Sequence, residues 1–232
     1  MPGDMKKDLT EIAFILDRSG SMAPVTESAI TGFNEFLRDQ QKAEGQARLT
    51  LVLFDNEYLV PLDCIPVQEA VALDTTTYVP RASTALLDAI GTTIDRLGAR
   101  ISEMTEPERP GQVIVAILTD GLENSSKKFT WKDISHKILE QTNTYKWRFL
   151  FLGANQDAIA TAASLNIAAE NASAFASDDV GNKSAQRAMG RKMSAMRKMA
   201  FGARLSCQEQ ADVSASLSKI VAEEDAEGRK EK

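Results

Sequence analysis

The sequence predicts an α/β protein built on a mostly parallel sheet, with helices on both faces, one antiparallel edge strand and a C-terminal helical extension. Three short, mainly apolar runs, at residues 12–16, 113–118 and 147–152, have the length and composition of buried strands. Segments with apolar residues at helical spacing separate them. Strands that alternate with helices in this way form parallel sheets covered on both faces. Of the 232 residues, 43% are hydrophobic, which is enough for a sizeable core.

The first half of the chain predicts two strand–helix units and an edge hairpin. Pro24 precedes a segment in which Val25, Ala29 and Phe33 share one helical face, so a helix should begin there. The Asp55-Asn56 pair separates two strand-like runs and favours a hairpin turn. The predicted elements are a strand at 12–16, a helix at 25–37, strands at 48–54 and 57–62, a loop with a short helix at 67–79, and a helix at 86–101.

The second half continues the alternation of strands and helices. Two prolines and a glycine within residues 106–111 predict an exposed loop before the next apolar run. The lone histidine, His136, falls on a predicted surface helix, far from the serines discussed below, so we expect it to be structural or solvated. The predicted elements are strands at 113–118 and 147–152, with helices at 131–139 and 158–165.

A change of composition near residue 178 predicts three regions: a domain at 8–176, a basic, Met-rich helix at 177–208 and a flexible tail at 209–232. Asp178 and Asp179 can cap a helix that runs over 180–204. Either this helix docks on the sheet with a solvated basic back, which we favour, or it binds a partner. One face would carry Met189, Met193, Met196 and Met199, and the other faces Arg187, Arg191, Lys192, Arg197 and Lys198.

Composition narrows the function classes. The net charge of −6 and the pI of about 5.0 argue against generic nucleic-acid binding, which leaves a basic footprint. The first ten residues are polar and do not resemble a secretory signal, and no apolar run approaches the ~18 residues of a membrane span. Cys64 and Cys207 show no metal-ligand spacing, and we expect reduced thiols. We therefore expect a cytoplasmic protein that binds neither nucleic acid nor membrane; its oligomeric state stays open.

A cluster of oxygen donors follows two of the apolar runs. Asp17 directly follows one predicted strand and Asp120 lies two residues after another, and ligands of open α/β sheets bind at the carboxyl ends of the strands. Two such carboxylates repel unless a positive charge lies between them. Ser19 and Ser21 alternate with Gly20, so that their hydroxyls can point the same way.

The donor set consists of carboxylates and hydroxyls, with no imidazole or thiolate nearby. Hard oxygen ligands suit Mg²⁺, Mn²⁺ or Ca²⁺ and do not suit Zn²⁺ or Cu²⁺. A third hydroxyl should come from another loop at the same sheet edge, and Thr84 is the candidate because it directly precedes the second long helix. The predicted metal residues are Asp17, Ser19, Ser21, Thr84 and Asp120.

The pattern Asp17-x-Ser19-x-Ser21, then Thr84, then Asp120 resembles the metal-ion-dependent adhesion site (MIDAS) of von Willebrand factor A (vWA) domains. The segments FILDRSGSM, STALLDAIG and ILTDG are also similar to that family, and the resemblance covers residues 11–165. It implies a Rossmann-like, doubly wound fold with the metal at the top of the sheet. Ser19, Ser21 and Thr84 would bind the ion directly, whereas Asp17 and Asp120 would act through water or hydrogen bonds.

The resemblance also implies a function. One coordination position would be left for a Glu or Asp carboxylate of a protein partner. The tripeptides GSM and TDG, and the segment FLGANQDAIATAASLNI, resemble intracellular bacterial or phage members of the family more than secreted ones. Those members include stress-response proteins of the tellurite-resistance type and chelatase-associated domains. We therefore expect a non-enzymatic scaffold or adaptor that binds its partner through a metal ion.

Two other functions stay open. The same ion could bind a phosphate-bearing substrate of a phosphoester-processing enzyme. However, Ser19 stands where aspartyl-phosphate phosphatases have a second aspartate, and the sequence has no nucleophile elbow and no phosphate-binding glycine loop. Alternatively, the chain is a structural or assembly protein with a silent metal site and contacts through its C-terminal helix.

Overall fold

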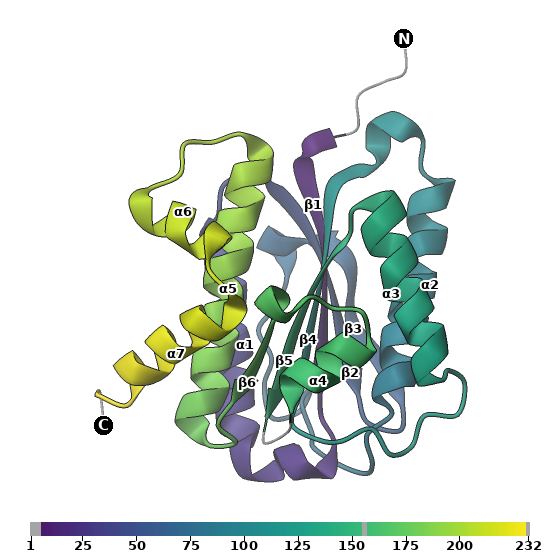
Figure 1. The fold of residues 1–232 in the computed structure, drawn as a ribbon, viewed down its shortest axis with the longest axis vertical. Helices are drawn as coiled ribbons and strands as arrows, with labels where there is room; N and C mark the ends of the chain where they lie inside the picture. The colour runs from purple at the N-terminus through teal and green to yellow at the C-terminus, as the bar shows by residue number, and fades with distance from the viewer. Residues whose placement is uncertain (1–5, 155–156, 231–232) are drawn as a thin grey trace.

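The computed structural model describes residues 6–154 and 157–230, so Asn155 and Gln156 of the segment singled out above lie outside it. Six strands form one sheet in the order β3-β2-β1-β4-β5-β6. All neighbouring strands are parallel except β3, which pairs antiparallel to β2 at one edge (Figure 1). The predicted mostly parallel sheet with one antiparallel edge strand is confirmed. The strands are β1 (Lys6–Asp17), β2 (Gln46–Phe54), β3 (Tyr58–Pro66), β4 (Pro110–Thr119), β5 (Arg148–Ala154) and β6 (Ala172–Phe175).

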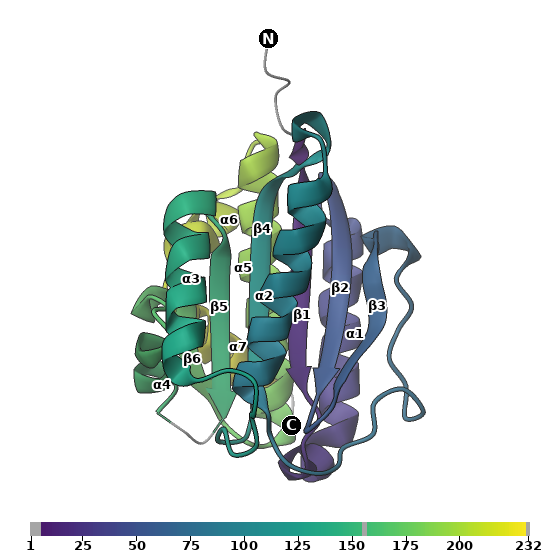
Figure 2. The ribbon, with the colours of Figure 1, turned by 90° about the vertical axis from the view of Figure 1, so that its right-hand side faces the viewer.

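Helices cover both faces of the sheet, as expected of a Rossmann-like fold. Figures 1 and 2 show α2 and α3 on one face, and α1 and α5 on the other. The α-helices are α1 (Thr26–Lys42), α2 (Leu86–Glu103), α3 (Trp131–Tyr145), α4 (Ala158–Ser164), α5 (Asp179–Phe201), α6 (Cys207–Ser214) and α7 (Leu217–Gly228). The short 3-10 helices are η1 (Gly20–Val25), η2 (Val67–Glu69), η3 (Glu106–Glu108) and η4 (Ala169–Asn171).

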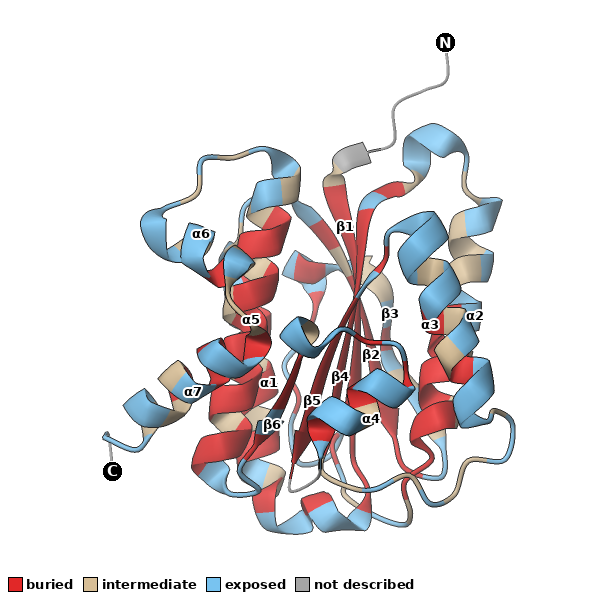
Figure 3. Ribbon diagram, in the orientation of Figure 1, coloured by how far each residue is buried: buried red, intermediate tan, exposed pale blue. Residues whose placement is uncertain are grey.

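The core is divided by the sheet into two apolar clusters. Successive side chains of a strand point to opposite faces, and β1 shows this because Phe14 packs with α1 and α5 whereas Ile15 packs with α2 and α3. Phe14, Phe33 and Phe36 form an aromatic group under α1, with ring centroids 4.7–6.0 Å apart. Both faces of the central strands are therefore buried (Figure 3). None of the described helices is long and apolar enough to cross a membrane.

Helix α5 is a structural part of this fold. Asp178 caps it, as predicted, by accepting a hydrogen bond from the Gly181 backbone, and the helix lies between α1 and α7. Met189, Met193 and Met196 are buried in the core, whereas Met199 remains 38% exposed. The methionine face therefore packs mainly inside the molecule.

The expectation of a solvated basic back on this helix is wrong. Arg197 is only 1% exposed and donates hydrogen bonds to the Gln40 and Gly45 carbonyl oxygens, at 2.7 and 2.9 Å. Lys192 is buried and donates to the Ala215 carbonyl oxygen at 2.6 Å. These two cations therefore hydrogen-bond backbone carbonyls within the fold and do not form a solvated surface.

The expectation of a flexible tail is also wrong for the described part of 209–232. Helices α6 and α7 lie there and pack against α5. Ser206 and Ser216 cap the two helices, and Leu217 and Ile220 are fully buried against the α5 layer. Burial of these apolar side chains accounts for the order of a segment whose polar composition predicted none.

Candidate metal site

Three loops meet at the carboxyl end of the central strands, at the bottom of Figure 1. Asp17 ends β1, Asp120 follows the neighbouring strand β4, and Thr84 lies in the loop before α2. A backbone hydrogen bond joins the loop after β1 to the loop before α2, because Gly20 donates to the Ala82 carbonyl oxygen at 3.1 Å. Gly20 permits this approach, since a Cβ atom there would lie 3.3 Å from that oxygen.

The three predicted hydroxyls converge on one point. The Ser19 and Ser21 Oγ atoms are 3.0 Å apart. All three hydroxyls lie close to Gly121. A Cβ atom on Gly121 would lie 2.8 Å from Thr84 Oγ1, 3.4 Å from Ser21 Oγ and 3.6 Å from Ser19 Oγ. The hydroxyls therefore surround a small space that only a glycine leaves open.

The two carboxylates lie behind these hydroxyls. Asp17 is fully buried, and its two oxygens accept hydrogen bonds from the Ser19 backbone N–H at 2.7 Å and the Thr119 hydroxyl at 2.6 Å. Asp120 is half-buried and accepts from the Ser21 hydroxyl at 2.6 Å. The structure thus brings all five predicted residues close together: hydrogen bonds link Asp17, Ser19, Ser21 and Asp120, and the Thr84 hydroxyl lies beside Gly121 with the two serine hydroxyls.

Burial of the two carboxylates disfavours their charged forms. It raises the pKa of Asp17 from 3.8 to about 6, against the opposing effect of the hydrogen bonds from Thr119 and Ser19, and the nearby Asp120 adds to the rise. Burial also raises the pKa of Asp120, against the hydrogen bond from Ser21. A bound cation would remove this penalty, because it favours the ionised carboxylates.

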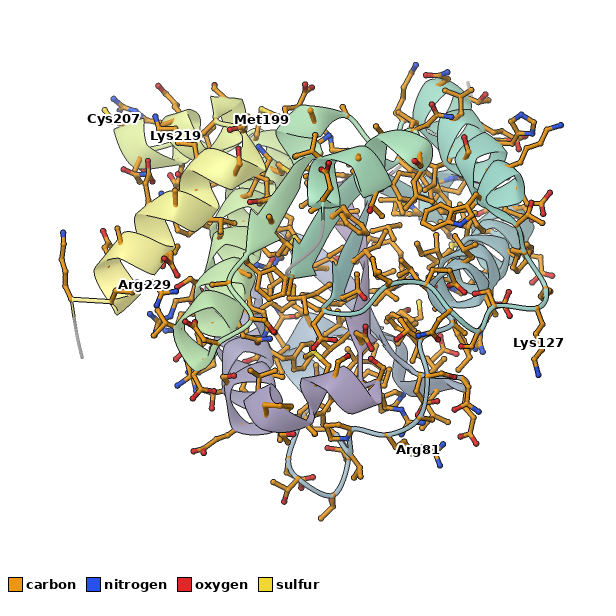
Figure 4. The ribbon with its side chains drawn as sticks, turned by 60° about the horizontal axis from the view of Figure 1, so that its bottom comes forward. Arg81, Lys127, Met199, Cys207, Lys219 and Arg229 are labelled. Carbon is orange, nitrogen blue, oxygen red and sulfur yellow. The ribbon has the colours of Figure 1, made fainter. Side chains whose placement is uncertain are left out.

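Arg18, the arginine within the DRSGS motif, does not supply a positive charge to Asp17 or Asp120. Arg18 lies between Asp17 and Ser19 in sequence, but its guanidinium points to the next strand end and pairs with Asp55 at 3.0 Å. Arg81 pairs with the same carboxylate at 3.0 Å and also with Glu57. In Figure 4, which brings this end of the molecule forward, Arg81 and Lys127 project outward into solvent.

Three further residues contribute to the candidate site and were not among the five predicted from the sequence. Thr119 donates to Asp17, and Gly121 leaves the space between the hydroxyls. Tyr78 is fully buried, and its hydroxyl donates to the Asp17 backbone carbonyl at 2.6 Å. Thr119 and Gly121 flank Asp120, so their sequence position was a usable signal. Nothing in the sequence around Tyr78 indicates this long-range contact.

The donor set fits a hard divalent ion. In an octahedral shell with Mg–O distances of about 2.0–2.1 Å, neighbouring oxygens lie about 3 Å apart. The Ser19–Ser21 oxygen separation of 3.0 Å has this value. The described residues hold no group of three or more His, Cys, Asp and Glu side chains that could bind a metal, so hydroxyls must contribute to any site of this kind.

Comparisons with known proteins identify the fold. No family model matches the sequence, and no curated protein matches it. Among solved structures, the pilus adhesin SpaC from Lactobacillus rhamnosus GG is 12% identical with a TM-score of 0.58, over 84% of this chain and 31% of that one. The mussel byssus proximal thread matrix protein 1, with zinc in its MIDAS motif, is 15% identical with a TM-score of 0.53, over 83% of this chain and 46% of that one.

A third match carries the family name of the fold. The von Willebrand factor type A protein from Catenulispora acidiphila is 15% identical with a TM-score of 0.51, and the match covers 83% of this chain and 43% of that one. This chain therefore corresponds to less than half the length of these three solved chains. Together with the sheet order and the helices on both faces, these matches show that the chain has the fold of a von Willebrand factor type A domain.

Proposed function

We propose that this chain is a metal-dependent protein-interaction module. A divalent cation, Mg²⁺ or else Mn²⁺ or Ca²⁺, is bound by the hydroxyls of Ser19, Ser21 and Thr84, and a Glu or Asp side chain of a protein partner completes its coordination shell. The observation that carries the proposal is the convergence of these three hydroxyls on the space beside Gly121. Their hard oxygens suit these ions.

The two carboxylates have a different role in the proposal. Both oxygens of Asp17 already accept hydrogen bonds, and Asp120 accepts one from Ser21, so both acids act on the ion through hydroxyls or water. Neutral direct ligands leave the ion with residual positive charge, and this charge attracts an incoming carboxylate. Without the ion, Asp17 and Asp120 would repel an acidic partner.

The solved structures support the proposal through the zinc-occupied MIDAS motif of the mussel protein, which has the same fold. Its zinc also shows that a site of this type is not limited to the hard ions preferred here. The motif phrasing of FILDRSGSM and ILTDG supports a cytoplasmic scaffold or adaptor in a bacterial or phage complex, including one with a role in stress responses.

The first test is ion binding itself. Isothermal titration of the chelator-treated protein with Mg²⁺ and Mn²⁺ should show one site, and Ser21→Ala should lose most of the affinity. Ser21 is exposed, so this variant should fold. Thr26→Ala is the matched control, because Thr26 hydrogen-bonds only local carbonyl oxygens at Met22 and Ala23. Absence of binding by the wild type would contradict the proposal.

The second test is partner capture. Tagged wild type, Asp17→Ala and Ser21→Ala proteins are incubated with extract from the source cells, with Mg²⁺ or with EDTA. A partner retained by the wild type in Mg²⁺ and lost in the other samples is expected. A partner that every sample retains would rule out binding through the metal. Turnover in a panel of phosphoesters that Asp17→Asn abolishes would instead favour the enzyme alternative.

Assembly through the C-terminal helix has lost its main support. The methionines that would make such contacts are buried, apart from Met199. Truncation before α5 would also remove Met189 and Met193 from the core, so the loss of a partner in that variant would only report unfolding.

A further inference from the structure

The loop that follows β4 is bound tightly to the residue that supplies the third hydroxyl. Asn124 makes two hydrogen bonds with the backbone of Thr84: its Oδ1 accepts from the Thr84 N–H at 2.9 Å, and its own N–H donates to the Thr84 carbonyl oxygen at 3.0 Å. The described residues give Thr84 no other partner in this loop. Asn124 itself is exposed and contributes nothing to the apolar core.

The neighbouring residue extends this connection to α2. Glu123 accepts from the Leu87 N–H at 3.0 Å, in the first turn of the helix, and from the backbone N–H groups of Ser125 and Ser126. Asp88 of the same helix accepts from the N–H groups of residues 127–129. Glu123 and Asp88 thereby fix this loop to the first turn of α2. The two hydrogen bonds of Asn124 are the ones that hold Thr84 itself.

We propose that Asn124 is a positioning residue that sets the affinity for the metal ion by holding Thr84 against Gly121. This inference rests on the proposed metal site. Asn124 does not bind the ion itself, since its Oδ1 accepts the hydrogen bond from the Thr84 N–H. Its effect is exerted through the Thr84 hydroxyl, which lies only 2.8 Å from the position that a Gly121 Cβ would take.

The physical reason is the strict geometry of small divalent ions. Mg²⁺ requires near-octahedral ligands at about 2.0–2.1 Å, so displacement of one hydroxyl by a few tenths of an ångström costs affinity. Ser19 and Ser21 lie on the loop after β1, whereas Thr84 lies on a separate loop. The two hydrogen bonds between Asn124 and Thr84 join this second loop to the loop after β4, which also contains Asp120 and Gly121. Residues that orient metal ligands typically contribute about 10–100-fold to metal affinity.

The test is titration of chelator-treated protein with Mn²⁺ and Mg²⁺, comparing the wild type with Asn124→Ala, Asn124→Asp and Ser125→Ala. Asn124→Ala should bind the ion at least about tenfold more weakly. Asn124→Asp keeps an oxygen that can accept from the Thr84 N–H, so its affinity should equal or exceed that of the wild type. Ser125→Ala is the matched control on the same loop, because the buried Ser125 hydroxyl has no hydrogen-bond partner in the described structure, and its affinity should not change.

Urea denaturation in EDTA separates positioning from a merely structural role. The three variants should unfold with nearly the wild-type midpoint when no metal is present, because Asn124 is exposed. Wild-type affinity in Asn124→Ala, or equally weak binding in Asn124→Ala and Asn124→Asp, would overturn the inference while the metal site stands. A wild-type protein that binds neither ion would overturn the metal site and this inference with it.

Discussion

Two neighbouring strand ends carry a buried aspartate each, and they differ in how the charge is balanced. Asp55 follows β2 and pairs with Arg18 and Arg81, each at 3.0 Å. Asp17 ends β1, next to the last residue of β2, and receives only hydrogen bonds from neutral groups. Both side chains are fully buried.

The comparison distinguishes a structural acid, Asp55, from Asp17, the acid of the proposed metal site. The chain itself supplies the cations that balance Asp55 at the end of β2. At Asp17 the chain supplies hydroxyls and a second acid, while burial raises the pKa of Asp17 to about 6. A site that lacks its own counter-charge favours a cation from solution.

The largest expected effect is at the end of β2, where Asp55 pairs with two arginines. Asp55→Ala leaves the buried Arg18 guanidinium with only Glu57, at 3.7 Å, and so should lower the free energy of unfolding by about 3–5 kcal/mol. Urea denaturation in EDTA measures this loss. Asp63→Ala is the control, because Asp63 is an exposed acid that also pairs with two arginines, and its removal should cost under about 1 kcal/mol. Equal losses in the two variants would contradict the assignment of Asp55 as a structural acid.

The next largest effect is at the end of β1, where Asp17 receives hydrogen bonds from neutral groups only. Mg²⁺ at about 100 times its Kd should raise the free energy of unfolding of the wild type by about 2.7 kcal/mol, and Asp17→Asn should lose this response. Without metal, Asp17→Asn should be at least as stable as the wild type, because burial opposes the charge of Asp17 and an amide oxygen can still accept from Ser19. A strongly destabilised metal-free variant would show that Asp17 is structural, like Asp55.

A smaller effect should follow from filling the space between the hydroxyls. The Cβ of Gly121→Ala would lie 2.8 Å from Thr84 Oγ1, so the variant should bind the ion about tenfold more weakly, which is about 1.4 kcal/mol. Gly98→Ala in α2 is the control, since its Cβ would meet no atom within 4 Å. That variant should keep its metal affinity and gain about 0.5–1 kcal/mol of stability. Unchanged metal binding in Gly121→Ala would place the ion elsewhere.

The smallest effect should come from Arg81→Ala. The Arg81 side chain is 47% exposed, so water screens its pairing with Asp55, and Arg81→Ala should lower the urea midpoint far less than Asp55→Ala does. Arg18 would remain as the buried partner of Asp55. A loss as large as that of Asp55→Ala would instead make Arg81 the main counter-charge at this strand end.

Most of the sheet could be predicted because its strands are uninterrupted apolar runs. Strands β4 and β5 begin within three residues of their predicted starts, and β1 extends its predicted run in both directions. Strand β6 was missed because it has only four residues, ASAF, and small alanines carry little periodicity. Helix α6 was missed although Ser206 and Glu209 form a capping box, a signal that was present in the sequence.

The proximity of the five candidate residues could be predicted because they lie at strand ends or just before a helix, where topology brings side chains together. Thr119 and Gly121 were adjacent to a predicted residue and could have been included. Asn124 could not, because its role depends on hydrogen bonds to a residue 40 positions earlier in the chain.

The sequence by itself determined the chain order of most strands and helices, the polarity of the strand ends at Asp17 and Asp120, and the oxygen donors of the candidate site, because each depends on local pattern and spacing. Only the tertiary structure decided which charges are balanced. It directs Arg18 to Asp55 and away from Asp17, and it buries Arg197 among backbone carbonyls. The physical reason is that burial and pairing belong to groups that meet in space, and a charge acquires its cost or its function only from those neighbours.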